Sequence, residues 1–291
     1  MSVSNLTAEI ELARPAKRRS WRRQWMRNRL LVSGMVLLCV LALMFACAPL
    51  LTSYSPNHQD LLNVLAKPSS RHLLGTDDLG RDVWSRLLYA GRIDLSLGIA
   101  AVIAPFILGT TFGLLAGYLG GWVDIVIMRV LDIVVAFPFY VLVIAIVFAL
   151  GPGVKSIFIA ITAVAWVSYT RIVRGEVLVA RRIGYVQAAK AAGLSTPRIL
   201  FRHLTPNVLT QALVYAMSDI VMTILAIVTL GYLGLGVQAP TPEWGSMMQT
   251  GENYIQIHPL LVTAPGIAVV LTGFALSLIG DGLAGELGRK Q

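Results

Sequence analysis

The stretch YVQAAKAAGLSTPRILFRHLTPN, residues 185–207, differs in character from the rest of the 291-residue chain. It holds two arginines, a lysine and a histidine but no acid, whereas the whole chain is 56% hydrophobic and only 13% charged. Its alanine-rich half is strong helix former and ends at Gly193, a residue that can adopt a left-handed turn. Ser195-Thr196-Pro197 is then typical of a second helix start. The sequence therefore predicts a short basic helix–turn–helix inside a very apolar protein.

Composition identifies the surroundings of this stretch as a membrane. A mean hydropathy of +0.72 leaves too little polar material to cover a soluble domain of this length. The net charge of +9 could indicate nucleic-acid binding, but the basic residues lie between apolar segments and form no continuous stripe. Orientation in a bilayer explains them better, so we expect lipid and not nucleic acid as the partner. The class is an all-α polytopic membrane protein.

The apolar segments divide the chain into predicted spans and loops, since a helix needs about 17–25 apolar residues to cross a bilayer. Six transmembrane helices are predicted, at residues 30–51, 95–119, 122–150, 156–170, 208–232 and 259–279. The predicted regions are a cytoplasmic basic tail (1–29), the first span (30–51), a periplasmic loop with a surface helix (52–94), a five-helix core (95–282) that includes a cytoplasmic loop (171–207), and a cytoplasmic C-terminal tail (283–291).

The distribution of Lys and Arg predicts which loops are cytoplasmic. If the N-terminus is inside, 18 of the 24 basic residues are cytoplasmic and 6 are outside. This bias follows the positive-inside rule, so both termini are predicted to be in the cytoplasm. The 171–207 loop then becomes the largest cytoplasmic loop.

The chemistry of the 185–207 stretch suggests a docking element. Ile199, Leu200 and Leu204 are predicted to anchor a short amphipathic helix in a groove of another protein, with Arg198 and Arg202 beside them. Thr205-Pro206 is expected to close the element before the next span. The alternative is a basic loop that serves only topology.

Specific motifs make the sequence similar to a known family. QAAKAAG (187–193), with HLTPN (203–207) starting ten residues after its glycine, resembles the glutamate-alanine-alanine loop of binding-protein-dependent ABC importer permeases. Further stretches resemble the C-type permease subunit of the dipeptide, oligopeptide and nickel branch: HLLGTDDLGRDVWSRLLYAGR (72–92), MRVLDIVVAFP (128–138), YTRIVRGEVL (169–178), LGYLGLGVQAPTPEWGSMM (230–248) and GDGLAGEL (280–287). Two departures are Gln187 in place of the motif glutamate and AIVTLG before YLGLG.

This resemblance implies a type I ABC importer permease fold and a set of partners. The chain would pair with a second homologous permease subunit in the bacterial inner membrane, two ABC ATPase subunits would grip the loop, and a periplasmic solute-binding protein would deliver the solute. ATP and Mg would be bound by the ATPases, and this chain would carry no cofactor or metal. The resemblance places the coupling role on Ala188, Ala189, Gly193, His203 and Pro206, and on Gln187 without its charge. A peptide-like solute is the first expectation, an opine or sugar-derived solute the second, and a nickel chelate the third.

Other function classes lack the required patterns in the sequence. An enzyme would need a nucleophile–base or metal-ligand arrangement, which we do not find, so a non-catalytic subunit is expected. An autonomous secondary transporter would show two repeated halves with matching broken helices, and no such repeat is found.

Three positions inside the predicted spans attract attention because charges in a bilayer are costly. Asp219 is predicted to face the bundle interior, either paired or at the translocation path; the alternative is an acid that only packs the bundle. Arg129 and Asp132 lie one helical turn apart and are predicted to pair near the cytoplasmic end of the third span, bracing an inner gate or subunit interface.

Gly109, Gly113 and Gly117 share one helix face, which predicts close helix packing.

Overall fold

The computed structural model describes residues 28–288, which form helices and loops without a β-strand. Most of the predicted 1–29 tail, together with Arg289 and Lys290, lies outside the described residues. The helical elements are α3 (Arg29–Ala46), α4 (Ala48–Leu51), α5 (Val83–Leu119), α6 (Gly121–Val135), α7 (Phe139–Leu150), α8 (Val154–Ala180), α9 (Gly184–Ala191), α10 (Thr196–Arg198), the π-helical turn η1 (Ile199–Leu204), α11 (Thr205–Tyr232), α12 (Trp244–Glu252) and α13 (Leu260–Gly288).

The long apolar helices agree with a polytopic membrane protein, but one predicted span is broken. Within the described residues, five helices are long and apolar enough to cross a bilayer, and α6 with α7 makes a sixth span if the pair is counted as one. The two halves of that pair are bent by 85°. A straight third span over 122–150 is therefore wrong. Pro138 explains the break, since its ring disfavours helical backbone at the preceding residue.

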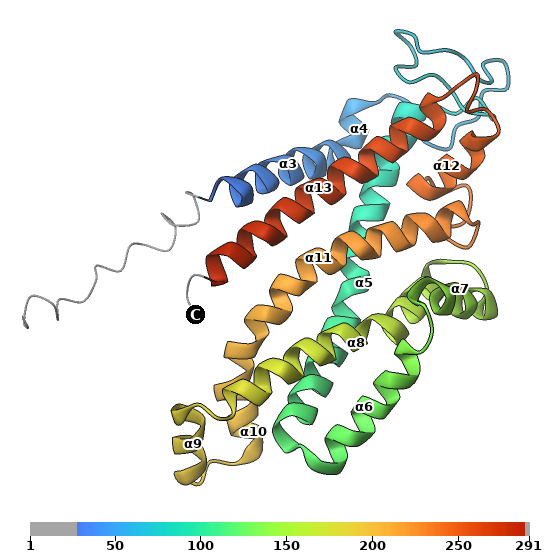
Figure 1. Cartoon of the computed structure of the whole chain (residues 1–291). Coiled ribbons are helices and arrows are strands. Elements are labelled where there is room, and N and C mark those ends of the chain that lie inside the picture. Colours follow the sequence, from blue (N-terminus) through green and yellow to red (C-terminus); the bar gives the residue numbers. More distant parts are fainter. Residues whose placement is uncertain (1–27, 289–291) are drawn as a thin grey trace, which may run out of the picture.

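The predicted surface helix before the second span is also wrong as a separate element. It is the first part of α5, which runs without interruption from Val83 to Leu119 and crosses Figure 1 from the loop of residues 52–82 to the start of α6. The carboxylate of Asp82 caps its start by accepting a hydrogen bond from the Ser85 amide at 2.7 Å. Two charged residues of this part of α5, Arg86 and Asp94, are buried within the chain.

The second helix of the 185–207 stretch is continuous with the fifth span. α10, η1 and α11 form one run from Thr196 to Tyr232, so Thr205-Pro206 does not close the element as expected. The wider π-helical turn explains how a proline is tolerated here: the Thr205 amide and hydroxyl both bond to the Leu200 carbonyl, and the Pro206 ring is accommodated after that turn. α13 likewise continues to Gly288, past the predicted start of the tail at 283.

Glycines allow two close helix pairs that organise the fold. On α5, a methyl group added to Gly109, Gly113 or Gly117 would overlap atoms of α8, which confirms the predicted packing face. α3 lies along α13 at one side of the molecule (Figure 1). There, an added Cβ on Gly34 would lie 2.7 Å from Leu278, and the Asn28 side-chain amide donates to the Gly282 carbonyl at 2.8 Å.

Candidate coupling site and polar interior

The turn between α9 and α10 is a specific helix-capping structure. Gly193 has φ +74°, the left-handed conformation that the sequence predicted. The Leu194 amide donates to the Ala189 carbonyl at 3.2 Å, and the Gly193 amide donates to the Lys190 carbonyl at 3.0 Å. These two bonds form a Schellman motif, which ends α9 and sets the direction of the next helix. α9 and α10 are found together at the lower end of Figure 1.

The predicted apolar anchors face the inside of this chain, which corrects our reading of the loop. Ile199, Leu200 and Leu204 are only 1%, 6% and 0% exposed. They belong to the same buried cluster as Val186 and Ala189 of α9. They therefore hold the two helices of the loop together. Because these side chains are already buried within this chain, they are not free to enter a groove of another protein.

A different set of side chains is available to a partner at this loop. Phe201 is 70% exposed, and it projects from the same turn as the buried Ile199 and Leu200. Other exposed residues of the same loop are Gln187, Ala188, Lys190, Arg198, Arg202 and Pro206. We call these seven residues the coupling face. Sequence reasoning missed Phe201 because a three-residue apolar run, Ile-Leu-Phe, is too short for periodicity to separate its buried and exposed members.

Side-chain contacts brace the loop against the ends of the long helices. The Lys190 ammonium lies 4.9 Å from the centre of the Tyr118 ring at the end of α5. The Arg181 guanidinium donates to the Gly117 carbonyl at 2.9 Å. The Asn207 side-chain amide donates to the Tyr185 hydroxyl at 2.7 Å and to the carbonyl of the half-buried His203 at 3.0 Å. The loop is thus fixed to α5 and α11.

Asp219 faces the bundle interior and has a partner, as predicted. It is 7% exposed, and its carboxylate accepts a hydrogen bond from the Tyr169 hydroxyl at 2.8 Å. The bond joins α11 to α8 in the middle of the membrane-spanning part. Its place on a translocation path stays a prediction.

The predicted Arg129–Asp132 pair is weak in this structure, and a stronger ion pair lies nearby. The two groups are 3.7 Å apart with side chains 80% and 52% exposed, a geometry that contributes little. By contrast, Arg174 of α8 makes two hydrogen bonds to Asp124 of α6, at 2.6 and 2.7 Å. This bidentate pair braces α6 against α8. The role of Arg129 and Asp132 at a gate or subunit interface stays a prediction.

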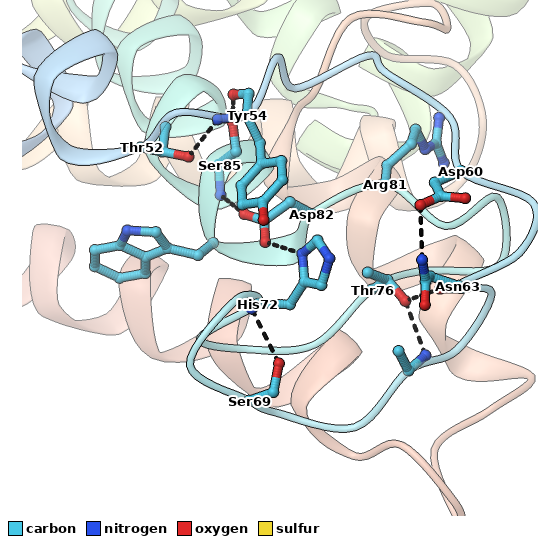
Figure 2. Close-up of polar contacts among 12 residues, drawn as sticks. Thr52, Tyr54, Asp60, Asn63, Ser69, His72, Thr76, Arg81, Asp82 and Ser85 are labelled. Atoms are coloured by element: carbon cyan, nitrogen blue, oxygen red, sulfur yellow. Dashed lines mark hydrogen bonds and ion pairs between the residues drawn. The ribbon is translucent and has the colours of Figure 1, made fainter.

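The loop of residues 52–82 is held by a network of polar contacts (Figure 2). His72 Nδ1 lies 2.8 Å from the carboxylate of Asp82, the residue that caps α5. The Ser85 hydroxyl donates to the Tyr54 carbonyl at 2.7 Å, and the Asn63 amide donates to the Asp60 carboxylate at 2.7 Å. The network ties the loop to the start of α5.

The short helix α12 is also held against α5, through buried acids. The Glu243 carboxylate caps α12 by accepting hydrogen bonds from the Gly245 and Ser246 amides at 2.7 and 2.8 Å. The Trp244 amide donates to Asp94 of α5 at 2.9 Å, and its indole donates to the Leu87 carbonyl at 3.2 Å. Burial raises the pKa of Glu243 to about 7, although the two amide hydrogen bonds act in the opposite direction.

Taken together, the long apolar helices and the braced, basic loop at one end define a polytopic integral membrane protein. The sequence matches the model of the binding-protein-dependent transport system inner membrane component over residues 109–291 and that of the N-terminal TM domain of oligopeptide transport permease C over residues 18–68. The chain belongs to the binding-protein-dependent transport system inner membrane component family.

Several curated relatives are similar to nearly the whole chain. A dipeptide transport system permease protein of Alkalihalophilus pseudofirmus is 41% identical, with 93% of this chain and 90% of the relative covered. A glutathione transport system permease protein of Pectobacterium atrosepticum is 37% identical over 94% and 91% of the two chains. A probable D,D-dipeptide transport system permease protein of Escherichia coli is also 37% identical, over 98% and 97%.

A solved structure establishes the fold independently of sequence. The chain is similar to the permease of an inward-facing methionine ABC transporter, with a TM-score of 0.55 and 18% identity. The match covers 67% of this chain and 93% of that one. The chain has the type I ABC importer permease fold.

Proposed function

We propose that this chain is the permease subunit of an ABC importer that moves a peptide-like solute from the periplasm to the cytoplasm, driven by separate ATPase subunits. The solute class is supported by the names of the relatives, which transport dipeptides, D,D-dipeptides and glutathione. An opine, a sugar-derived solute or a nickel chelate has no comparable support.

The proposed assembly contains this chain, a second homologous permease, two ABC ATPases and a periplasmic binding protein. Both termini and the coupling face lie in the cytoplasm in this assembly, which the excess of Lys and Arg on that side supports. ATP and Mg are bound by the ATPases. The permease itself is non-catalytic and provides the path.

One observation carries the proposal: an exposed docking face is built onto the end of a rigid transmembrane helix. Phe201 and Arg202 project from η1, and η1 continues into α11 without a break. A movement of an ATPase that grips the coupling face is therefore transmitted along α11 to Asp219 and its surroundings. A flexible loop would absorb the same movement.

Phe201→Ala in the assembled complex tests this coupling. An exposed phenylalanine that enters a partner's groove is a typical interface hot spot, so we expect about 2 kcal/mol weaker ATPase attachment, a roughly 30-fold rise in its dissociation constant. Phe274→Ala is the matched control, because Phe274 is also exposed, at 57%, but lies on α13.

Attachment is measured by titrating the purified ATPases onto the permease pair, and function is measured as ATP-driven dipeptide uptake in proteoliposomes with the binding protein. Equal affinities for the two variants would show that the loop does not bind the ATPases. Uptake that persists without ATPases would instead identify an autonomous transporter.

A further inference from the structure

A cavity of about 430 Å³ lies between the α6–α7 break, α8 and α11. Its volume falls in the range of sites for small organic ligands. Much of its wall is apolar, including Val134, Phe139 and Met222. Its polar lining residues are Ser168 and Arg171 of α8 and Tyr215, Asp219 and Thr223 of α11.

Asp219 gives one end of the cavity a negative charge with unused hydrogen-bonding capacity. Tyr169 donates to one carboxylate oxygen, and a carboxylate can accept about four hydrogen bonds. The Tyr215 ring packs edge-to-face on Tyr169, with ring centres 4.9 Å apart, and it also lines the cavity. An acid beside aromatic faces is an environment that favours an ammonium group.

Arg171 gives the same cavity a positive charge at a different position along the axis of α8. It lies two residues beyond Tyr169 on α8, which places its backbone about 3 Å farther along the helix axis than the residue that bonds Asp219. Over residues 28–288 neither Arg171 nor Asp219 forms an ion pair, so both charges are available. The long Arg171 side chain can increase the distance between its guanidinium and the Asp219 carboxylate to the length of a short peptide, which extends about 3.3–3.6 Å per residue.

We propose that this cavity is the chain's half of a binding site for a short zwitterionic peptide, with the α-ammonium at Asp219 and the α-carboxylate at Arg171. The apolar wall around Met222 then contacts the side chains without selecting one. The proposal rests on the proposed import of peptides and assigns the permease a recognition site of its own, in addition to that of the binding protein.

Cysteine protection in the purified, nucleotide-free complex tests the site without the binding protein. The reporter is Met222→Cys, on the cavity wall, in a chain with Cys39→Ala and Cys47→Ala. Its rate of reaction with a thiosulfonate reagent is measured against increasing Ala-Ala, N-acetyl-Ala-Ala and Ala-Ala amide. We expect Ala-Ala to slow labelling, and each blocked peptide to need an about tenfold or higher concentration, as the loss of one charged hydrogen-bonded contact implies.

Charge-removing variants assign each peptide end to its residue. Asp219→Asn should make Ala-Ala and N-acetyl-Ala-Ala equally weak, and Arg171→Gln should do the same for Ala-Ala and its amide. Matched controls are Asp281→Asn, on the exposed part of α13, and Lys155→Gln, at the other end of α8. Both controls should keep the tenfold discrimination. If Asp219→Asn does not assemble, the comparison of the three peptides with Asp219 intact still decides.

The same complex, reconstituted with ATPases and binding protein, separates the two proposals. Normal ATP-driven uptake of Ala-Ala, with no protection or with equal protection by all three peptides, would overturn the site and leave the import function. Absence of peptide uptake would overturn the import function itself.

Discussion

Replacing Gly193 isolates the contribution of one backbone conformation to coupling. Its φ of +74° costs a residue with a Cβ about 1–2 kcal/mol, and more for a β-branched one. An added Cβ would meet no atom within 4 Å, so no steric clash contributes. Gly193→Val should therefore disfavour the observed angle between α9 and α10 by about 2 kcal/mol, which is a roughly 30-fold change in population. We expect the helices of the core to stay assembled, because Gly193 lies outside them.

The assay measures ATPase binding and dipeptide uptake together, in purified complexes. Gly193→Asn is the matched control, because asparagine is close to valine in size but tolerates the left-handed conformation. Gly184→Val repeats the substitution at an equally open glycine that has no positive φ. We expect Val at 193 to weaken binding about 30-fold or to uncouple hydrolysis from uptake, and the two controls to stay within about threefold of the wild type, as for ordinary surface substitutions.

Valine at 193 with wild-type binding and uptake would refute the reasoning. It would mean that the Schellman turn does not set the geometry that the ATPases grip. A loss as large in Gly193→Asn would also refute it, since the effect would then follow side-chain size and not backbone conformation.

Three further predictions concern the helix packing and the start of α12. Gly113→Leu should lower the free energy of unfolding by several kcal/mol, because even a Cβ at this position would lie 2.7 Å from the Val173 Cβ. The readout is the melting temperature, and an unchanged value would show that α5 and α8 separate easily. Arg174→Gln should destabilise the packing of α6 against α8 by about 1–3 kcal/mol, and Arg129→Gln should do so by less than about 1 kcal/mol. The measurement is the resistance of α6 to protease, and equal effects would contradict the contrast between the two ion pairs. Because folding raises the pKa of Glu243 from 4.5 to about 7, the folded state holds a proton that the unfolded state has released, so stability should fall, by an amount on the order of 1–3 kcal/mol, as pH rises from about 4.5 to 7. Glu243→Gln should flatten that part of the melting-temperature profile, and an identical slope in the variant would exclude this carboxyl.

The sequence predicted what depends on local pattern and on charge. Long uncharged runs predicted the membrane helices, the four-residue glycine spacing predicted the α5–α8 contact, and Gly193 predicted the left-handed turn. Each of these follows from a property of a residue and its near neighbours. The interior position of Asp219 followed in the same way, from the cost of an unpaired charge in a bilayer.

Features that depend on three-dimensional packing were not predicted. Leu200 and Phe201 are adjacent and equally apolar, yet one is 6% and the other 70% exposed, because α9 covers only one side of η1. Arg86 and Asp94 are charged, yet both are buried, which the sequence does not indicate. Tyr169 as the partner of Asp219, and Asp124 as the partner of Arg174, each lie 50 residues away in the chain. Such pairings cannot be derived from spacing.

The packing of α3 against α13 has a consequence for synthesis. Among the membrane helices of residues 28–288, α3 is made first, whereas α13, on which it lies, is made last. At about 5–20 residues per second, the roughly 240 residues that separate the end of α3 from the end of α13 take about 12–50 s to make. During that time α3 must stay in the bilayer without this partner. After Arg29 the helix carries no charge, so it is stable in the bilayer without this partner, and the Asn28–Gly282 contact can form only after Gly282 has been made.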